Sequence, residues 1–213
     1  MTEARHTRRW LVGVAATVAA LGGVAMGLRY WRGEPPPAIG GYVLREPKAL
    51  PPVALVDEQG RPFRTADFAG HWSFLYFGYT YCPDVCPLTL VELATLKKRL
   101  AEQLPGESTD YYLVSVDPGR DTPERLRDYV TYFDPSFHGL TGSVTDLTLL
   151  AQQTGSVFFL PADQSQDAYL VGHSSNIALL DPDGRLYAVF TSPHEPAQLA
   201  ADFGRIVAYH ARR

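Results

Sequence analysis

The chain has 213 residues, of which 46% are hydrophobic and 20% are charged, and this composition suits one globular domain with an appendage. The net charge of −4 hides an uneven distribution. Residues 1–32 carry five Arg and one Glu (+4), and the rest carries fourteen Lys or Arg and twenty-two Asp or Glu (−8). A body with that charge and no basic run is not expected to bind nucleic acid.

The appendage is a run of nineteen uncharged residues, 10–28, which is long enough to cross the hydrocarbon core of a membrane as a helix. We therefore expect a cytoplasmic tail at 1–9 and a transmembrane anchor at 10–28. The alternative is a cleaved signal peptide, with a weak cleavage site at 20–22. The anchor is favoured because the run is longer than a signal core, and either interpretation exports the domain. The expected location is the inner membrane, single-pass, with the C-terminal domain in the periplasm or another extracytoplasmic space.

Residues 29–50 contain three consecutive prolines and are expected to form an extended stalk, followed by a folded domain at 51–213. The first elements expected are a hairpin from 53–56 and 61–63 and a buried strand at 72–79. Later elements alternate between helices and strands. The expected helices are 87–104, 122–133, 144–154 and 195–210, and the expected strands are 111–116, 157–160, 176–180 and 186–190. This order predicts an α/β domain that mixes parallel and antiparallel strands.

The chain has only two cysteines, Cys82 and Cys86, in the segment GYTYCPDVCP at 78–87. They lie between a predicted strand and a predicted helix. A helix N-terminus stabilises the thiolate, which is both the nucleophile and the metal ligand. The pair could bind a soft metal, act as a redox dithiol or form a disulfide, and the spacing alone does not decide among these.

A third ligand would favour a metal, and His173 is the candidate among six histidines. It lies in a short polar break before the hairpin that begins at Asn176. A lone histidine at a strand edge is by default a structural or surface residue. If the hairpin pairs near the 72–79 strand, His173 would lie beside Cys82 and Cys86. Two thiolates and one imidazole suit Cu(I), Cu(II) with added ligands, or zinc with a water molecule.

Three ordered motifs make the chain resemble the Sco/SenC family of copper proteins. They are the cysteine segment GYTYCPDVCP, the segment SVDPGRDTP at 115–123, and His173-Ser174 followed by LDPDG at 180–184. The similarity runs from about Pro51 to the last helix.

The resemblance implies a thioredoxin-like domain on a single membrane anchor that binds copper through Cys82, Cys86 and His173. Such proteins help to assemble the dinuclear copper centre of cytochrome c oxidase. They deliver copper to its copper-site subunit or reduce the cysteines of that subunit, and other copper chaperones or thiol reductants are implied partners. Asp117 matches an acidic family position, with an implied role in supporting the ligands or recognising a partner.

Two positions depart from the family pattern. Gly172 stands where members commonly have Asp, and Gly119 stands where they often have Glu. Both differences remove negative charge.

The interpretation we favour is a copper metallochaperone rather than a turnover enzyme. The rival is a membrane-tethered thiol-disulfide oxidoreductase or peroxidase-like protein, which needs Cys82 and Cys86 but not His173. A third possibility is an exported binding domain whose cysteines form a permanent disulfide.

Overall fold

The computed structural model describes residues 18–24, 27, 34–164 and 169–213. The chain divides into two compact units, Met1–Pro36 and Pro37–Arg213. In the first unit, residues 18–24 are helical. Within the described ranges, no helix has the length and apolar character needed to cross a membrane. The expected tail at 1–9 and most of the expected anchor at 10–28 lie outside these ranges.

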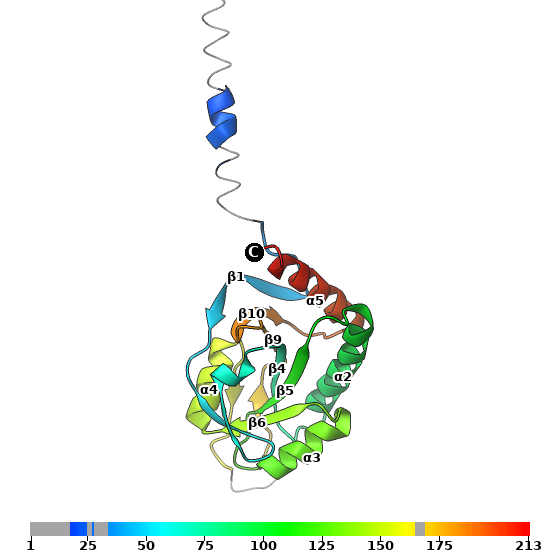
Figure 1. Ribbon diagram of the computed structural model, residues 1–213. Helices are drawn as coiled ribbons and strands as arrows, with labels where there is room; N and C mark the ends of the chain where they lie inside the picture. The colour runs from blue at the N-terminus through cyan, green and yellow to red at the C-terminus, as the bar shows by residue number, and fades with distance from the viewer. Residues whose placement is uncertain (1–17, 25–26, 28–33, 165–168) are drawn as a thin grey trace, which may run out of the picture. The chain divides into compact units, whose positions relative to one another are not determined.

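The centre of the second unit is an eight-stranded mixed sheet with the order β1-β10-β9-β4-β5-β6-β2-β3 (Figure 1). Strands β4, β5 and β6 run parallel, and the pairings on either side of them are antiparallel. The strands of this sheet are β1 (Gly41–Ala49), β2 (Ala54–Asp57), β3 (Pro62–Arg64), β4 (Trp72–Gly78), β5 (Thr109–Ser115), β6 (His138–Gly142), β9 (Ile177–Leu180) and β10 (Arg185–Phe190). The predicted α/β class with mixed strand directions is therefore confirmed.

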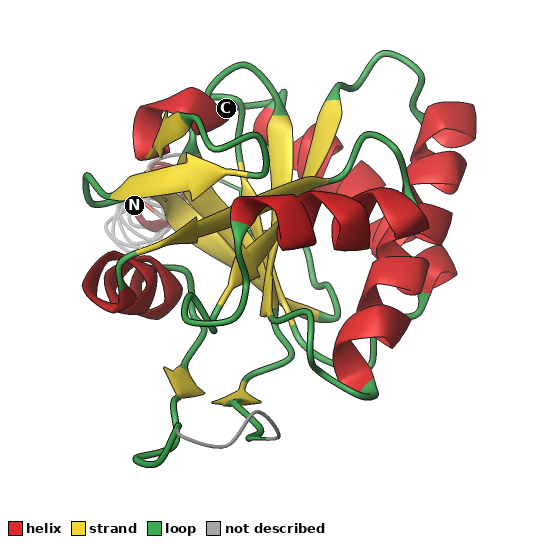
Figure 2. Cartoon of the chain, turned by 90° about the horizontal axis from the view of Figure 1, so that it is seen from below, coloured by secondary structure: helices red, strands yellow, loops and turns green. Residues whose placement is uncertain are grey.

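Helices cover both faces of the sheet. They are the short 3-10 helix η1 (Thr65–Phe68), α2 (Val85–Gln103), α3 (Pro123–Phe133), α4 (Val144–Gln153) and α5 (Pro196–His210). Helices α2 and α3 connect consecutive parallel strands, so right-handed crossovers place both on the same face. Helix α5 lies beside α2, and α4 covers the opposite face (Figure 1). A separate two-stranded sheet of β7 (Phe158–Phe159) and β8 (Gly172–His173) projects from the main sheet (Figure 2).

The buried core explains why β4 lies at the centre. All seven residues of Trp72–Gly78 are buried, which is typical of a strand covered on both faces. Phe74 stacks on Tyr111 of β5 with the ring planes 4° apart and also packs against Phe203 of α5. This aromatic layer packs against the amino-terminal half of β4, and the cysteine segment begins at the other end of the strand.

The expected boundary between stalk and domain at residue 51 is wrong. Residues 41–49 form strand β1, which pairs with β10 at the edge of the sheet, and the compact unit begins at Pro37. Most side chains of β1 are exposed or half-buried, and the pairing with β10 shifts register between Val43 and Lys48. An edge strand of this kind has no regular apolar alternation, so its sequence resembles a linker.

A buried carboxylate at the far edge of the sheet makes stability depend on pH. Glu58 is almost fully buried; it accepts a hydrogen bond from the Gly139 N–H and lies 3.0 Å from His138 Nδ1. Burial opposes ionisation of Glu58, but hydrogen bonds from His138, Gln59 and backbone N–H groups outweigh it and lower its pKa to about 2. The same hydrogen bond raises the pKa of His138, against the effect of burial.

We expect this pair to contribute about 2 kcal/mol of stability within a limited pH window. Because the pKa of Glu58 is lowered on folding, its contribution is complete above its unfolded value of about 4.5 and disappears as pH falls towards 2. Because the pKa of His138 is raised, its contribution is complete below about 6.5 and declines as pH rises through the folded value. Urea unfolding of Glu58→Gln from pH 2 to pH 8 should show a flatter profile than the wild type. Glu102 is exposed, so Glu102→Gln should show the same pH profile of stability as the wild type. If Glu58→Gln also shows the wild-type profile, this assignment is contradicted.

Candidate metal centre

The two cysteines lie where β4 passes into α2. The helix begins at Val85, two residues earlier than predicted, so Cys86 lies in its first turn while Cys82 lies in the preceding loop. Both are free thiols, and the Cys86 N–H lies 3.5 Å from Cys82 Sγ, oriented to donate to it. Both cysteines are buried, but Cys82 is 9% exposed and Cys86 is fully buried, so Cys82 is the more accessible residue of the pair.

Close packing behind Cys86 depends on Gly78, the last residue of β4. A Cβ atom at this position would lie 2.9 Å from Cys86 Sγ, 3.0 Å from a ring carbon of Tyr76 and 3.1 Å from Leu113 Cδ1. All three distances are shorter than an ordinary van der Waals contact. The absence of a side chain at Gly78 therefore allows the Cys86 sulfur to lie against the strand.

Gly78→Ala is expected to displace Cys86, to lower the free energy of unfolding by about 1–3 kcal/mol, and to weaken metal binding by the cysteine pair. The matched control is Gly106→Ala, because a Cβ atom there meets nothing within 4 Å. Denaturant unfolding and metal titration of both variants test the expectation. Wild-type stability and affinity in Gly78→Ala would show that the sulfur does not depend on this contact.

His173 reaches the cysteines from the small second sheet. Its Nε2 lies 3.3 Å from Cys86 Sγ, and its Nδ1 lies 3.0 Å from the Ser174 carbonyl oxygen. With the Nδ1–H donated to that carbonyl, Nε2 keeps its lone pair directed at the sulfur, as metal-binding histidines require. The rings of Tyr76 and Tyr79 make edge-to-face contacts with the imidazole.

The ligand atoms of Cys82, Cys86 and His173 all lie within 4.8 Å of one another. Strand β9 pairs antiparallel with β4, which is the condition under which His173 was expected to meet the cysteines. The expected polar break at His173 is corrected, since Gly172 and His173 form strand β8 opposite β7. This pairing also reduces the predicted strand at 157–160 to the two residues of β7.

Burial dominates the acid–base properties of Cys86 and His173. It raises the pKa of Cys86, outweighing a hydrogen bond from the Tyr79 backbone. The expected stabilisation of a thiolate by the helix N-terminus is therefore not the main influence on this cysteine. Burial also lowers the pKa of His173, which keeps the imidazole neutral and able to bind a metal. A metal binding here must displace a proton from the buried thiol.

Asp117, the acidic residue expected near the site, does not point into the trio. Its carboxylate is fully buried, where it accepts hydrogen bonds from the Tyr169 hydroxyl (2.6 Å) and from Arg120 Nε (2.5 Å). A Cβ at Gly119 would come within 4 Å of both Tyr169 and Asp117, whereas one at Gly172 meets nothing. Gly172 therefore leaves open space where a larger side chain would fit.

Two tyrosines and an arginine make contacts around the trio that the sequence did not predict. The Tyr76 hydroxyl donates to Cys86 Sγ at 3.7 Å, and the Tyr79 hydroxyl accepts the Val171 N–H. Arg120 contacts Asp117 and Tyr169. Aromatic residues at the end of a buried strand are expected to form core and the wall of a site, but no pattern along the chain predicts these hydrogen bonds, and an arginine in a loop looks solvent-exposed.

Comparison with known proteins agrees with this geometry. A family model described as SCO1/SenC matches residues 45–208. A protein of Stutzerimonas stutzeri described as copper-binding is 40% identical over 154 residues, which cover 71% of this chain and 73% of that protein. The mitochondrial SCO2 homologue of Mus musculus is 35% identical over 161 residues, or 74% of this chain and 62% of its own length.

A solved structure shows the same fold with a metal in place. The crystal structure of Arabidopsis thaliana ScoI with copper bound superimposes with a TM-score of 0.69 and 30% identity, covering 74% of this chain and 97% of that one. The expected thioredoxin-like α/β fold is confirmed. The family match over most of the folded unit, together with these relatives, shows that the chain belongs to the SCO1/SenC family.

Proposed function

We propose that this protein is a copper metallochaperone that binds one copper ion through Cys82, Cys86 and His173. The observation that carries the proposal is the convergence of these three ligand atoms within 4.8 Å. Two soft sulfur ligands and one imidazole favour Cu(I), and Cu(II) with an added ligand. The family resemblance extends the proposal to the dinuclear copper centre of cytochrome c oxidase, whose copper-site subunit would receive the ion.

Transfer by ligand exchange requires one ligand that an acceptor can reach. Cys82 is the more exposed residue of the pair, and it is bordered by exposed Tyr81 and Pro83, whereas Cys86 is fully buried. An acceptor thiolate would therefore replace Cys82 first, while Cys86 and His173 still hold the ion. This order follows from exposure alone.

The same thiols could instead prepare the acceptor by reducing a disulfide in it. The Cys82 thiolate would attack one acceptor sulfur, and Cys86 would then attack Cys82. The products would be two acceptor thiols and a Cys82–Cys86 disulfide, which an external thiol reductant must reopen. Copper delivery is the role that the site favours, because it uses His173 as well as the two cysteines, whereas disulfide reduction uses the cysteines alone.

The location we propose is the inner membrane, with residues 10–28 as a single anchor and the folded unit on the extracytoplasmic side. The support is the run of nineteen uncharged residues near the N-terminus, which is long enough to span the membrane and is followed by the folded unit. Carbonate extraction of membranes from cells that express the full chain tests the anchor. Release of the intact protein into the soluble fraction would reject it.

The test of function is an anaerobic Cu(I) titration of the reduced protein, followed by Cu(II) titration with absorption spectroscopy. We expect one tightly bound ion per chain and a sulfur-to-copper charge-transfer band for Cu(II). Absence of tight binding, together with rapid disulfide exchange by Cys82, would instead support the rival oxidoreductase or peroxidase-like function.

A further inference from the structure

The two cysteines lie on the segment between β4 and the first turn of α2 (residues 79–86, the cysteine loop), and His173 lies on residues 169–174 (the histidine segment). These segments are distant in the sequence, so contacts between them or with the rest of the fold must hold them together. The cysteine loop is fixed on one side by the start of α3. The Thr80 N–H and hydroxyl donate to the Asp121 carboxylate at 3.2 and 2.6 Å, and Arg125 Nε donates to the Thr80 hydroxyl oxygen at 2.6 Å. These contacts anchor the cysteine loop but do not reach the histidine segment.

The histidine segment is fixed at Tyr169, four residues before His173. The Tyr169 hydroxyl donates to Asp117 Oδ1 at 2.6 Å. Arg120 donates from Nη2 to the Tyr169 carbonyl at 3.0 Å and from Nε to Asp117 Oδ2 at 2.5 Å. Arg120 thus binds both the backbone of Tyr169 and the carboxylate that accepts its hydroxyl.

The guanidinium of Arg120 also joins the two segments by stacking. Its central carbon lies 3.5 Å from the ring centroid of Tyr169 and 4.6 Å from that of Tyr81, the residue before Cys82. The central guanidinium carbon of Arg125 lies 3.9 Å from the centroid of the same Tyr81 ring. Arginines and tyrosines therefore alternate from the histidine segment to the cysteine loop, and Arg120 is the cation shared by the two.

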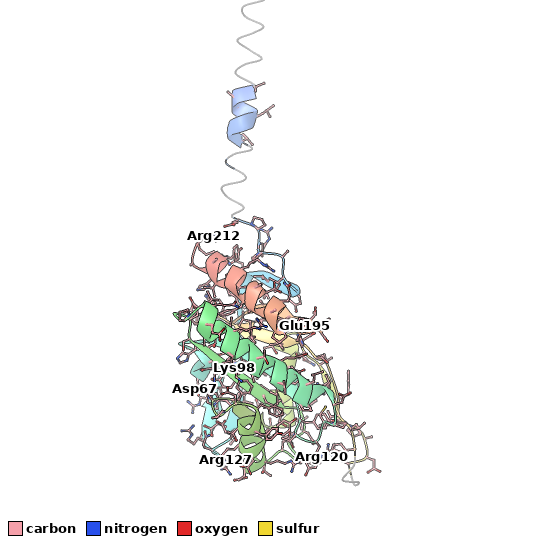
Figure 3. All side chains as sticks on the ribbon, turned by 90° about the vertical axis from the view of Figure 1, so that its right-hand side faces the viewer. Asp67, Lys98, Arg120, Arg127, Glu195 and Arg212 are labelled. Carbon is pink, nitrogen blue, oxygen red and sulfur yellow. The ribbon has the colours of Figure 1, made fainter. Side chains whose placement is uncertain are left out.

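Burial makes these contacts strong. The Arg120 side chain is 12% exposed and that of Asp117 is 1% exposed, so water screens their ion pair little. Arg120 lies at the end of the folded unit opposite to Arg212, where α5 finishes (Figure 3). A second hydrogen bond also joins the two segments. The Val171 N–H donates to the Tyr79 hydroxyl at 3.3 Å, which is longer than the hydrogen bonds of Arg120 and involves no charged group.

We propose that Arg120 is a positioning residue that holds His173 in reach of Cys82 and Cys86 before copper arrives. The inference rests on the proposed copper-binding function and extends it to the residues that preorganise the site. A histidine segment released from Arg120 must be ordered when copper binds, and this entropic cost reduces the affinity. Partners that orient metal ligands typically change affinity about 10–100-fold when they are removed.

The experiment compares Arg120→Gln, Arg120→Lys and Tyr169→Phe in the full chain. Arg120→Lys keeps a charge for Asp117 but loses the planar stack and the second hydrogen bond. Tyr169→Phe keeps the ring and loses only the hydrogen bond to Asp117, so it offers a mild change that is expected to fold. The matched control is Arg127→Gln, an exposed arginine of α3 that pairs only weakly with its neighbour Asp128.

Two measurements decide the result. Amide hydrogen exchange of Val171 and Ser174 in the copper-free protein reports the ordering of the histidine segment, and Cu(I) competition reports affinity. We expect Arg120→Gln to speed exchange at least about tenfold and to weaken Cu(I) binding about 10–100-fold. Arg120→Lys and Tyr169→Phe should show smaller changes in the same direction, and Arg127→Gln should show none.

The proposal is overturned if either measurement is unchanged in all three variants at the site. Faster exchange with unchanged affinity would mean that the ordered segment does not serve copper binding. Weaker binding with unchanged exchange would mean that Arg120 acts in another way. Failure of the wild type to bind copper would reject the proposed function, and the exchange measurement would then decide by itself whether Arg120 holds the segment.

Discussion

Replacing His173 with alanine is expected to weaken Cu(I) binding by more than about 100-fold, since even residues that only orient metal ligands contribute about 10–100-fold. The variant loses the Nε2 atom that lies 3.3 Å from Cys86 Sγ, and no other histidine belongs to the cluster of metal-binding groups found in the described part of the chain. For Cu(II), the sulfur-to-copper band should shift and weaken, because a site without the imidazole has a different geometry.

The fold should survive this substitution. The backbone pairing of β8 with β7 does not involve the His173 side chain, so circular dichroism and the unfolding midpoint should stay close to those of the wild type. The matched control is His71→Ala, which removes a half-exposed histidine that pairs with Asp110. Equal Cu(I) and Cu(II) affinities in His173→Ala and His71→Ala would refute the assignment of His173 as a ligand.

The parts of the fold that the sequence predicted well are those with a strong repeating pattern. The buried run at 72–78 and the leucine stripe of α2 mark a covered strand and an amphipathic helix regardless of the rest of the chain. Strand β1 and the two-residue strands β7 and β8 lack such a pattern, because their pairing is set by the neighbours they meet in three dimensions. Local sequence does not contain that information.

The candidate site likewise contains residues that the sequence predicted and residues that it did not. Cysteine and histidine are uncommon residues with specific chemistry, so Cys82, Cys86 and His173 could be proposed before their distances were known. The groups that support them are ordinary residue types. Tyr76 looks like core and Arg120 looks like a surface cation until the structure places them against Cys86 and Tyr169. Asp117 was expected to support the ligands or to recognise a partner. Its carboxylate is buried, and it binds Tyr169 and Arg120 inside the protein.

A second large effect is expected at Asp121, where alanine should lower the free energy of unfolding by about 3 kcal/mol. Asp121 is 1% exposed and accepts hydrogen bonds from Thr80 and from the Ser115 hydroxyl at 2.6 Å. Each buried donor left without an acceptor costs about 1–3 kcal/mol, and the substitution leaves at least two. Burial raises the pKa of Asp121 despite these hydrogen bonds, so the folded state already bears the cost of a desolvated carboxylate, which partly offsets the loss.

The effect of Asp121→Ala should extend to the metal centre, because Thr80 lies two residues before Cys82 and Asp121 is its anchor. Asp121→Asn keeps one acceptor oxygen and should lose only about 1 kcal/mol. Asp128→Ala, which removes an exposed carboxylate on α3, should change stability by less than about 0.5 kcal/mol.

Urea unfolding of the copper-free variants gives all three values, and Cu(I) competition under native conditions gives their affinities. If Asp121→Ala proves as stable as Asp128→Ala, the cysteine loop is held by contacts other than this carboxylate. If it is destabilised but binds copper like the wild type, the anchor serves folding and not the site.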